Sequence, residues 1–199
     1  FVNTTYSPSD RNASIRDVNG NLLLVADERG IRDALFNLLP GGDSLSLGWS
    51  SPMANITILP KPGDPQRYFV FVVQATPPRA AGYVEVDMSG NGGMGAIVSA
   101  GTQWFATDMT SKLATTPHAN GSDYWIVLHS SSGDTFSAYR LSETGLEANA
   151  IISNTGRSFV ATPDPTISMD QWGPMTINVQ GDQLAMVNSR HTSPDTLTT

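Results

Sequence analysis

Residues 112–141, KLATTPHANGSDYWIVLHSSSGDTFSAYRL, carry the clearest structural pattern in this sequence. Three runs rich in β-branched or aromatic residues, Lys112–Pro117, Tyr124–His129 and Thr135–Leu141, alternate with two turns rich in Asn, Gly, Ser and Asp. Short runs of this composition, separated by such turns, are typical of antiparallel strands. The stretch therefore predicts a small antiparallel sheet, and with it an all-β protein.

The same pattern recurs on both sides of this stretch. Residues 68–74, YFVFVVQ, are almost entirely apolar, which predicts a strand buried on both faces. Residues 82–88, GYVEVDM, alternate polar and apolar side chains, as in a strand with one buried face. Further strands are predicted in residues 13–26 around a turn at Asn19-Gly20, 55–60, 96–105, 146–154, and 173–188 around Gly181.

One interval is ambiguous. In Asp27–Leu39 the apolar residues Ile31, Leu35, Leu38 and Leu39 fit the 3.6-residue period of a helix. The same interval also fits a strand around Ala34–Leu38, and Pro40-Gly41-Gly42 ends either element.

A repeat organises these strands. Hairpins with a polar, Gly-containing turn and a strongly apolar second strand return at intervals of roughly 40–60 residues, with room for a second strand pair between them. Such four-stranded units indicate a β-propeller, with units near residues 13–54, 55–110, 111–172 and 173–199. A β-sandwich is the alternative. Four units with incomplete first and last copies predict a partial propeller, completed by another segment or chain. The sequence begins with Phe1 and has no signal-peptide pattern, so we expect a piece of a longer product.

Composition narrows the function classes. The formal net charge is −7 with no basic cluster, so binding to nucleic acid is disfavoured. The chain has no cysteine, which excludes disulfides and cysteine-based sites. Its apolar runs of about six residues are far shorter than the roughly 20 that a membrane-spanning helix needs. Abundant Gly, Pro, Ser, Thr and Asn suit a turn-rich extracellular β protein. Asn-x-Ser/Thr triplets, which arise easily by chance in such a chain, begin at Asn3, Asn12, Asn55 and Asn120.

The segments GNLLLVADERG, ITILPKPGDPQRYFVFVVQA, GYVEVDMSGNGGMGAIVS and KLATTPHANGSDYWIVLHSSSGDTFSAYRLSETGL occur here in this order. Together they resemble the propeller-like region of large secreted Bacteroidetes surface proteins, which often carry gliding-motility-type C-terminal sorting domains. The likeness runs from about Ala13 to Ser189. It departs from the family at VADERGIRDALFNLL, where the family has an aromatic, Asp-Gly-containing strand. The resemblance implies a cell-surface or secreted protein exported by type IX secretion, and adhesion or glycan binding more than catalysis.

The most promising binding residues lie in one turn. His118, Asn120 and Asp123 offer hydrogen-bonding groups, and Trp125 offers an indole that could stack on a sugar ring. The alternative is an ordinary turn, in which the polar side chains bond the turn backbone and Trp125 packs into the sheet. Trp49, Trp104 and Trp172 are further candidates for packing or for carbohydrate stacking.

Two other turns resemble calcium loops, because oxygen-bearing residues occupy alternate positions. These residues are Asp17, Asn19 and Asn21 in one turn, and Asp87, Ser89 and Asn91 in the other. Neither turn has the Glu that an EF-hand needs, so plain hairpin turns are the favoured interpretation. No cofactor is predicted beyond this calcium alternative. The histidines are widely spaced, and no third ligand joins His118 and His129 to define a zinc site.

No catalytic constellation is visible in the sequence. We therefore expect a non-enzymatic extracellular β-propeller module that mediates adhesion by binding a glycan or a protein at the cell surface. One alternative is a structural subunit of an extracellular assembly, whose strand edges pair with another chain. A second alternative is a propeller hydrolase or lyase that acts on polysaccharide.

Overall fold

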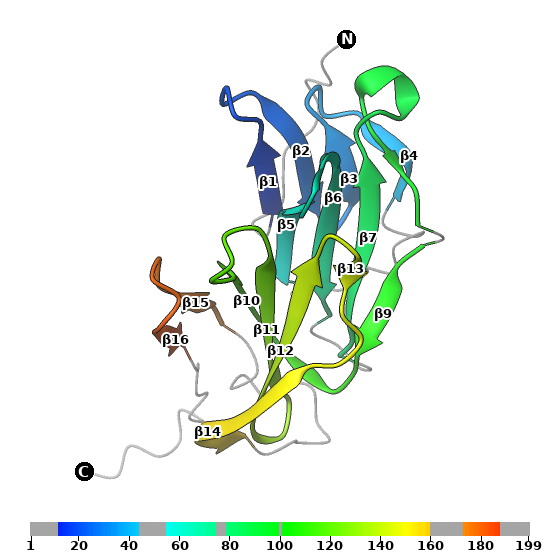
Figure 1. Cartoon of the computed structure of the whole chain (residues 1–199). Helices are drawn as coiled ribbons and strands as arrows, with labels where there is room; N and C mark the ends of the chain where they lie inside the picture. The colour runs from blue at the N-terminus through cyan, green and yellow to red at the C-terminus, as the bar shows by residue number, and fades with distance from the viewer. Residues whose placement is uncertain (1–11, 44–54, 75–78, 100, 160–172, 188–199) are drawn as a thin grey trace, which may run out of the picture.

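The computed structural model describes residues 12–43, 55–74, 79–99, 101–159 and 173–187 (Figure 1). The described part is built of antiparallel strands with one short 3₁₀ turn, η1 (Asn91–Gly93), so the all-β prediction is confirmed. Four sheets follow one another in chain order, and each is assembled from strands that are consecutive in sequence. None of the four closes on itself within the described residues.

The first sheet is a four-stranded meander in the order β1-β2-β3-β4. Its strands are β1 (Asn12–Arg16), β2 (Leu22–Asp27), β3 (Gly30–Asp33) and β4 (Leu38–Asp43). The helix considered for residues 27–39 is wrong, and so is a strand over residues 34–38. That interval contains β3, a tight turn, and the start of β4. Asp33 closes the turn by accepting the backbone N–H groups of Leu35 and Asn37 at 2.8 and 2.9 Å.

The second sheet is centred on the predicted apolar strand. It consists of β5 (Asn55–Lys61), β6 (Asp64–Val73), β7 (Ala81–Asp87), β8 (Ala96–Ile97) and β9 (Gln103–Ala106). The strand predicted over residues 96–105 is in fact two short strands, β8 and β9, which pair with opposite ends of β7.

The third sheet contains the stretch that first indicated the fold. Its strands are β10 (Met109–Pro117), β11 (Tyr124–Ser130), β12 (Gly133–Ser142), β13 (Gly145–Leu146) and β14 (Ile151–Phe159). The three predicted strands are confirmed with nearly the predicted bounds. The fourth sheet has two described strands, β15 (Met175–Ile177) and β16 (Leu184–Met186).

The first hairpin turns of three sheets are closed in the same way. In each turn the leading residue donates its backbone N–H to a carbonyl four or five residues later, and its side chain accepts a turn N–H. The leading residues are Asp17 in the first sheet, His118 in the third and Asn178 in the fourth. His118 fulfils this role with its ring Nδ1, which accepts the N–H of Asn120 at 3.0 Å. The repeat inferred from the sequence is thus also a repeat of turn chemistry.

The second sheet is buried on both faces, as the apolar sequence of β6 predicted. Alternate residues of its strands point in opposite directions, so each face carries its own apolar set. One set packs against the first sheet and comprises Ile58, Tyr68, Val70, Val72, Val84 and Val86, which meet Leu24, Ala26, Ile31 and Leu39. The other packs against the third sheet and comprises Leu59, Phe69, Phe71, Val73 and Ala81, which meet Ile126, Leu128, Tyr139 and Leu141.

The leading strands of successive sheets lie next to one another. Contacts join β1 to β5, β5 to β10, and β10 to β15, so the four leading strands form a series along one side of the molecule (Figure 1). The later strands of each sheet extend away from this series. This arrangement brings the turns of neighbouring sheets together at the ends of the strands.

We expect Phe71→Ala to lower the free energy of unfolding by about 3–5 kcal/mol, because Phe71 is 1% exposed in the interface between the second and third sheets. Denaturant unfolding followed by intrinsic fluorescence measures the change. Val18→Ala, at a fully exposed turn position, is the control and should shift stability by less than about 0.5 kcal/mol. Equal effects of the two substitutions would contradict the sheet packing described above.

Candidate functional site

The predicted site residues His118, Asn120 and Asp123 lie in the turn between β10 and β11. The backbone N–H of His118 donates to the carbonyl of Asp123 at 2.8 Å. The side-chain oxygen of Asn120 accepts the N–H groups of Ser122 and Asp123 at 3.2 and 3.1 Å. Much of the polar capacity of this turn is therefore used to hold its own backbone.

The imidazole of His118 also contacts the predicted stacking residue. Its ring centroid lies 5.2 Å from that of Trp125, and the two rings are tilted by 43°. Trp125 is half-buried, and across the ladder it faces Thr116 on one side and Arg140 on the other. The structure thus brings all four predicted residues to one end of the third sheet.

Asp123 is the electrostatic centre of this region. Its Oδ2 accepts a hydrogen bond from Nε of Arg140 at 2.8 Å and forms an ion pair with Nη2 at 2.6 Å, and its Oδ1 accepts a hydrogen bond from the hydroxyl of Ser122 at 3.0 Å. The hydrogen bond from Arg140 is the main reason that the pKa of Asp123 is lowered. Asp123 is therefore a charged, anchored carboxylate at neutral pH and is unsuited to donate a proton.

A hollow of about 490 Å³, here called the rim basin, opens beside this ion pair. It is lined by Pro62, Gly63, Asn120, Ser122, Asp123, Arg140, Ser142, Glu143, Thr144 and Glu147. Three carboxylates and one guanidinium give the lining an excess of negative charge, and hydroxyl and amide groups fill the rest. Such a surface suits a neutral polyhydroxylated ligand or a cation, and it repels an anion.

The rim basin is formed by two sheets. Gly63, in the turn between β5 and β6, lies so near the third sheet that a Cβ there would come within 3.3 Å of the Cβ of Glu143. Its φ of 75° also favours glycine. The packing of the second sheet on the third therefore sets the shape of the rim basin.

Sequence reasoning missed Arg140, Glu143 and Glu147. A usable signal was present for Arg140, since pairing the predicted strands around the second turn places it opposite Trp125. The contribution of Gly63 had no local signal, because it depends on how two sheets pack.

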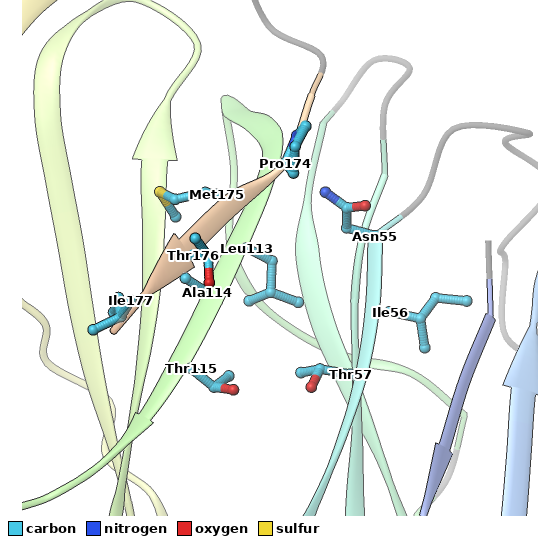
Figure 2. Close-up of a pocket in the computed structure, with 10 residues that line it drawn as sticks. All are labelled: Asn55, Ile56, Thr57, Leu113, Ala114, Thr115, Pro174, Met175, Thr176 and Ile177. Atoms are coloured by element: carbon cyan, nitrogen blue, oxygen red, sulfur yellow. The ribbon is translucent and has the colours of Figure 1, made fainter. Parts of the chain in front are cut away.

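A second hollow, of about 280 Å³, lies among the leading strands and is here called the leading-strand groove (Figure 2). Residues of β5, β10 and the β15 region line it: Asn55, Ile56, Thr57, Leu113, Ala114, Thr115, Pro174, Met175, Thr176 and Ile177. Thr57 and Thr115 face each other across it (Figure 2). Among the described residues β5 pairs only with β6, and β10 only with β11, so both strands turn an unpaired edge toward the groove. The amide of Asn55 joins the two strands by donating to the carbonyl of Ser111.

Two buried basic side chains lie in the third sheet. Lys112 is fully buried, and its Nζ donates to the carbonyl of Val187 at 2.6 Å, which ties the third sheet to the fourth. His129 is also fully buried, edge-on to Phe136 and Phe159 with ring centroids at 4.5 and 4.6 Å. Its Nδ1 is 2.7 Å from the carbonyl of Ser130, while Nε2 has no hydrogen-bond partner within the described residues. Burial is the main cause of its lowered pKa, to which Lys112 adds.

The first calcium-loop candidate lies in a hairpin turn. The carboxylate of Asp17 accepts the N–H groups of Asn19 and Asn21, both at 2.8 Å, and the Nδ2 of Asn21 at 2.9 Å. These bonds, the one from the Asn21 side chain foremost, lower the pKa of Asp17. Its oxygens are thus engaged by the turn itself.

The second candidate lies in the turn after β7. The carboxylate of Asp87 accepts the N–H and the hydroxyl of Ser89 at 2.9 and 2.6 Å, and these bonds lower its pKa. Asn91 has a positive φ of 51° in the following η1 turn. Within the described ranges no three His, Cys, Asp or Glu residues are grouped as a metal site would require.

The remaining candidates are dispersed. Trp104 is 43% exposed on β9, at the edge of the second sheet, and its ring lies over Gly82. Asn12 and Asn120 are exposed, whereas Asn55 is half-buried beside the leading-strand groove. Three further candidates lie outside the described residues: Asn3, Trp49 and Trp172.

Comparisons with known proteins gave no match to a family model, to a curated protein or to a solved structure. In the described part of the chain, no helix has the length and apolar character needed to cross a membrane.

We expect Arg140→Ala to raise the pKa of Asp123, because the substitution removes the hydrogen bond that lowers it. A carboxylate whose pKa is lowered by folding stabilises the protein at neutral pH, and this stabilisation is lost as the pH falls through the folded-state pKa. Carboxyl-detected NMR titration measures the shift. Arg67→Ala, which removes an arginine from a carboxylate cluster in the second sheet, is the control and should leave Asp123 unchanged.

We expect His129 to make the protein less stable as the pH falls below about 6.5, the ordinary imidazole value, since the unfolded chain then takes up a proton that the buried ring resists. One such group changes the unfolding free energy by at most about 1.4 kcal/mol per pH unit. His129→Phe should flatten this decline in unfolding experiments at several pH values. His118→Asn, which places an amide at the exposed turn as Asn178 does, is the control and should keep the wild-type decline. An unaltered slope in His129→Phe would refute this role.

Proposed function

We propose that this chain forms successive blades of a β-propeller and acts as a non-enzymatic binding module of a secreted or cell-surface protein, with a glycan bound at the rim basin. Three observations support the scaffold. The first three sheets are meanders of consecutive strands, each packs face to face on the next, and their leading strands lie side by side. These features agree with those of propeller blades, whose leading strands surround the axis.

The observation that carries the binding proposal is the position of the rim basin. It lies where turns of the second and third sheets meet, and binding residues are concentrated in loops held by a rigid scaffold. The anchored pair of Asp123 and Arg140 provides a fixed acceptor and donor there. Trp125 does not itself line the rim basin, but it is the cross-strand neighbour of Arg140, which does, so it offers an apolar ring next to the lining.

The chemistry of the lining favours a glycan among surface ligands. Sugar hydroxyls both donate and accept hydrogen bonds, so they complement a lining of carboxylates, hydroxyls, an amide and one guanidinium. The negative excess of this lining and the net charge of −7 both disfavour phosphate-rich ligands. Recognition by oriented hydrogen bonds and one stacking ring requires no catalytic group, and none is proposed.

The proposed location follows from composition and resemblance. A turn-rich chain with abundant Gly, Pro, Ser, Thr and Asn suits an extracellular protein, and the segments that resemble secreted Bacteroidetes surface proteins favour a module displayed outside the cell. A glycan-binding site on a protein displayed outside the cell suits adhesion to a polysaccharide or to a glycosylated protein.

We expect the purified protein to bind a defined set of glycans on an array, and Arg140→Ala and Trp125→Ala each to weaken that binding at least tenfold. Loss of Arg140 removes a donor and leaves Asp123 without its partner, while loss of Trp125 removes the stacking surface. The matched controls are Arg67→Ala and Trp104→Ala, which remove the same side-chain types from the second sheet, at similar exposure for the arginine pair.

Two results would contradict the proposal. In the first, Arg140→Ala and Trp125→Ala retain full binding. In the second, the protein releases new reducing or unsaturated sugar ends from a bound polysaccharide, because this would make it an enzyme. Circular dichroism and unfolding midpoints establish that each variant is folded before its binding is compared.

A further inference from the structure

An apolar hollow of about 450 Å³, here called the outer groove, lies on the face of the third sheet that points away from the second. It is lined by Val127, Phe136, Ala138, Ile151, Ser153, Thr155, Gly156, Leu184 and Met186. Its floor is formed by β11, β12 and β14, and one wall is formed by β16. Ile151 is 60% exposed and Leu184 is 39% exposed, which leaves a substantial apolar surface in contact with water.

The outer groove continues an interface that already exists in the molecule. The leading part of the same face is covered by the fourth sheet: Met175 of β15 is buried, and Lys112 of β10 donates to the carbonyl of Val187 just after β16. Gly173 lies close to Val187 as well, since a Cβ there would be 2.6 Å from its carbonyl oxygen. The covering ends at β16, which among the described residues pairs only with β15.

The other sheets show what occupies the corresponding place. In the second sheet the third strand, β7, packs Val84 and Val86 over the first sheet, in the cluster that contains Ile31 and Leu39. In the third sheet the third strand, β12, packs over the second, where the rings of Tyr139 and Phe105 meet at 4.9 Å. Twice, therefore, the third strand of one sheet covers the later strands of the preceding sheet. The outer groove, on the third sheet, lies where this pattern would place a third strand of the fourth sheet, and the described part of that sheet has two strands.

We propose that the outer groove is the docking surface for one extended β-strand segment, which pairs with the edge of β16 that is unpaired among the described residues and inserts apolar side chains at alternate positions over Phe136, Ala138 and Ile151. This inference rests on the propeller scaffold of the proposed function, but not on glycan binding. Strand addition supplies backbone hydrogen bonds along β16, and the pockets for alternate side chains supply specificity. A segment with the pattern of β7 or β12 has the required chemistry.

The test uses two fluorescent peptides with the sequences of the chain's own third strands, AGYVEVD (Ala81–Asp87) and GDTFSAYRLS (Gly133–Ser142). We expect saturable binding of at least one peptide to the full chain by fluorescence anisotropy. Serine in place of the apolar residues at alternate positions should abolish binding by that peptide. Ile151→Lys and Leu184→Lys should each weaken it at least tenfold, because they place a charge at the groove.

Val98→Lys is the matched control: it places a charge at an apolar residue of similar exposure away from the groove, and it should bind the peptide as the wild type does. Absence of saturable binding by both peptides overturns the inference, and so does equal binding by the serine-substituted peptide. A dimer in sedimentation velocity that Ile151→Lys dissociates also overturns it, because a second copy would then be the occupant. Glycan binding is measured on the same variants: peptide binding without glycan binding removes the proposed function alone, and the reverse result removes the strand-docking inference alone.

Discussion

The burial of β6 on both of its faces is the constraint on which the rest of the structure depends. Every side chain from Tyr68 to Val73 is buried, so the second sheet needs an apolar layer on either side. Each large apolar side chain removed from water contributes roughly 1.5–3 kcal/mol, and a sheet with two apolar faces is stable only when both are covered. The first and third sheets provide that cover, and their faces are apolar at matching positions. The stacking of a sheet on either side of the second is therefore a consequence of a continuous apolar run that can be recognised in a few residues.

This stacking also determines where polar chemistry collects. With the faces occupied by packing, the ends of the strands are the places where side chains of two sheets meet in water. The rim basin is such a place, because the turn at Gly63 approaches Glu143, and the pair of Asp123 and Arg140 belongs to the same lining. The hydrogen bonds that close the turn at His118 fix the backbone that carries Asp123. A ligand at this site would encounter groups that are already oriented, which reduces the entropy lost on binding.

Local patterns in the sequence were enough to predict most strands, and the reasons for the failures are physical. Strands such as β5, β6, β10 and β11 are bounded by turns with their own chemistry, so alternation and Gly- or Asn-containing turns located them. The error in residues 27–39 arose because two short strands around a tight turn mimic a helical spacing of apolar residues. The sequence predicted one binding site from His118, Asn120, Asp123 and Trp125. This grouping could be predicted because all four lie in or next to a single hairpin turn, so it needs no knowledge of how the sheets pack. The participation of Gly63 and Glu143, and the groove beside β16, arise from packing between sheets, which no window of sequence contains.

The two proposed surfaces differ in chemistry: the rim basin is polar, and the outer groove is apolar. The first three sheets pack on one another through buried apolar clusters, whereas the described strands of the fourth cover only the leading part of the third. Apolar surface at the outer groove is a property of the stacking face, where the same face-to-face rule applies to every sheet. Polar surface at the rim basin is a property of the turns, which contribute few buried apolar side chains to the packing between sheets. Turn residues can therefore change to suit a ligand while the faces continue to select strands, and the two kinds of recognition place independent demands on the sequence.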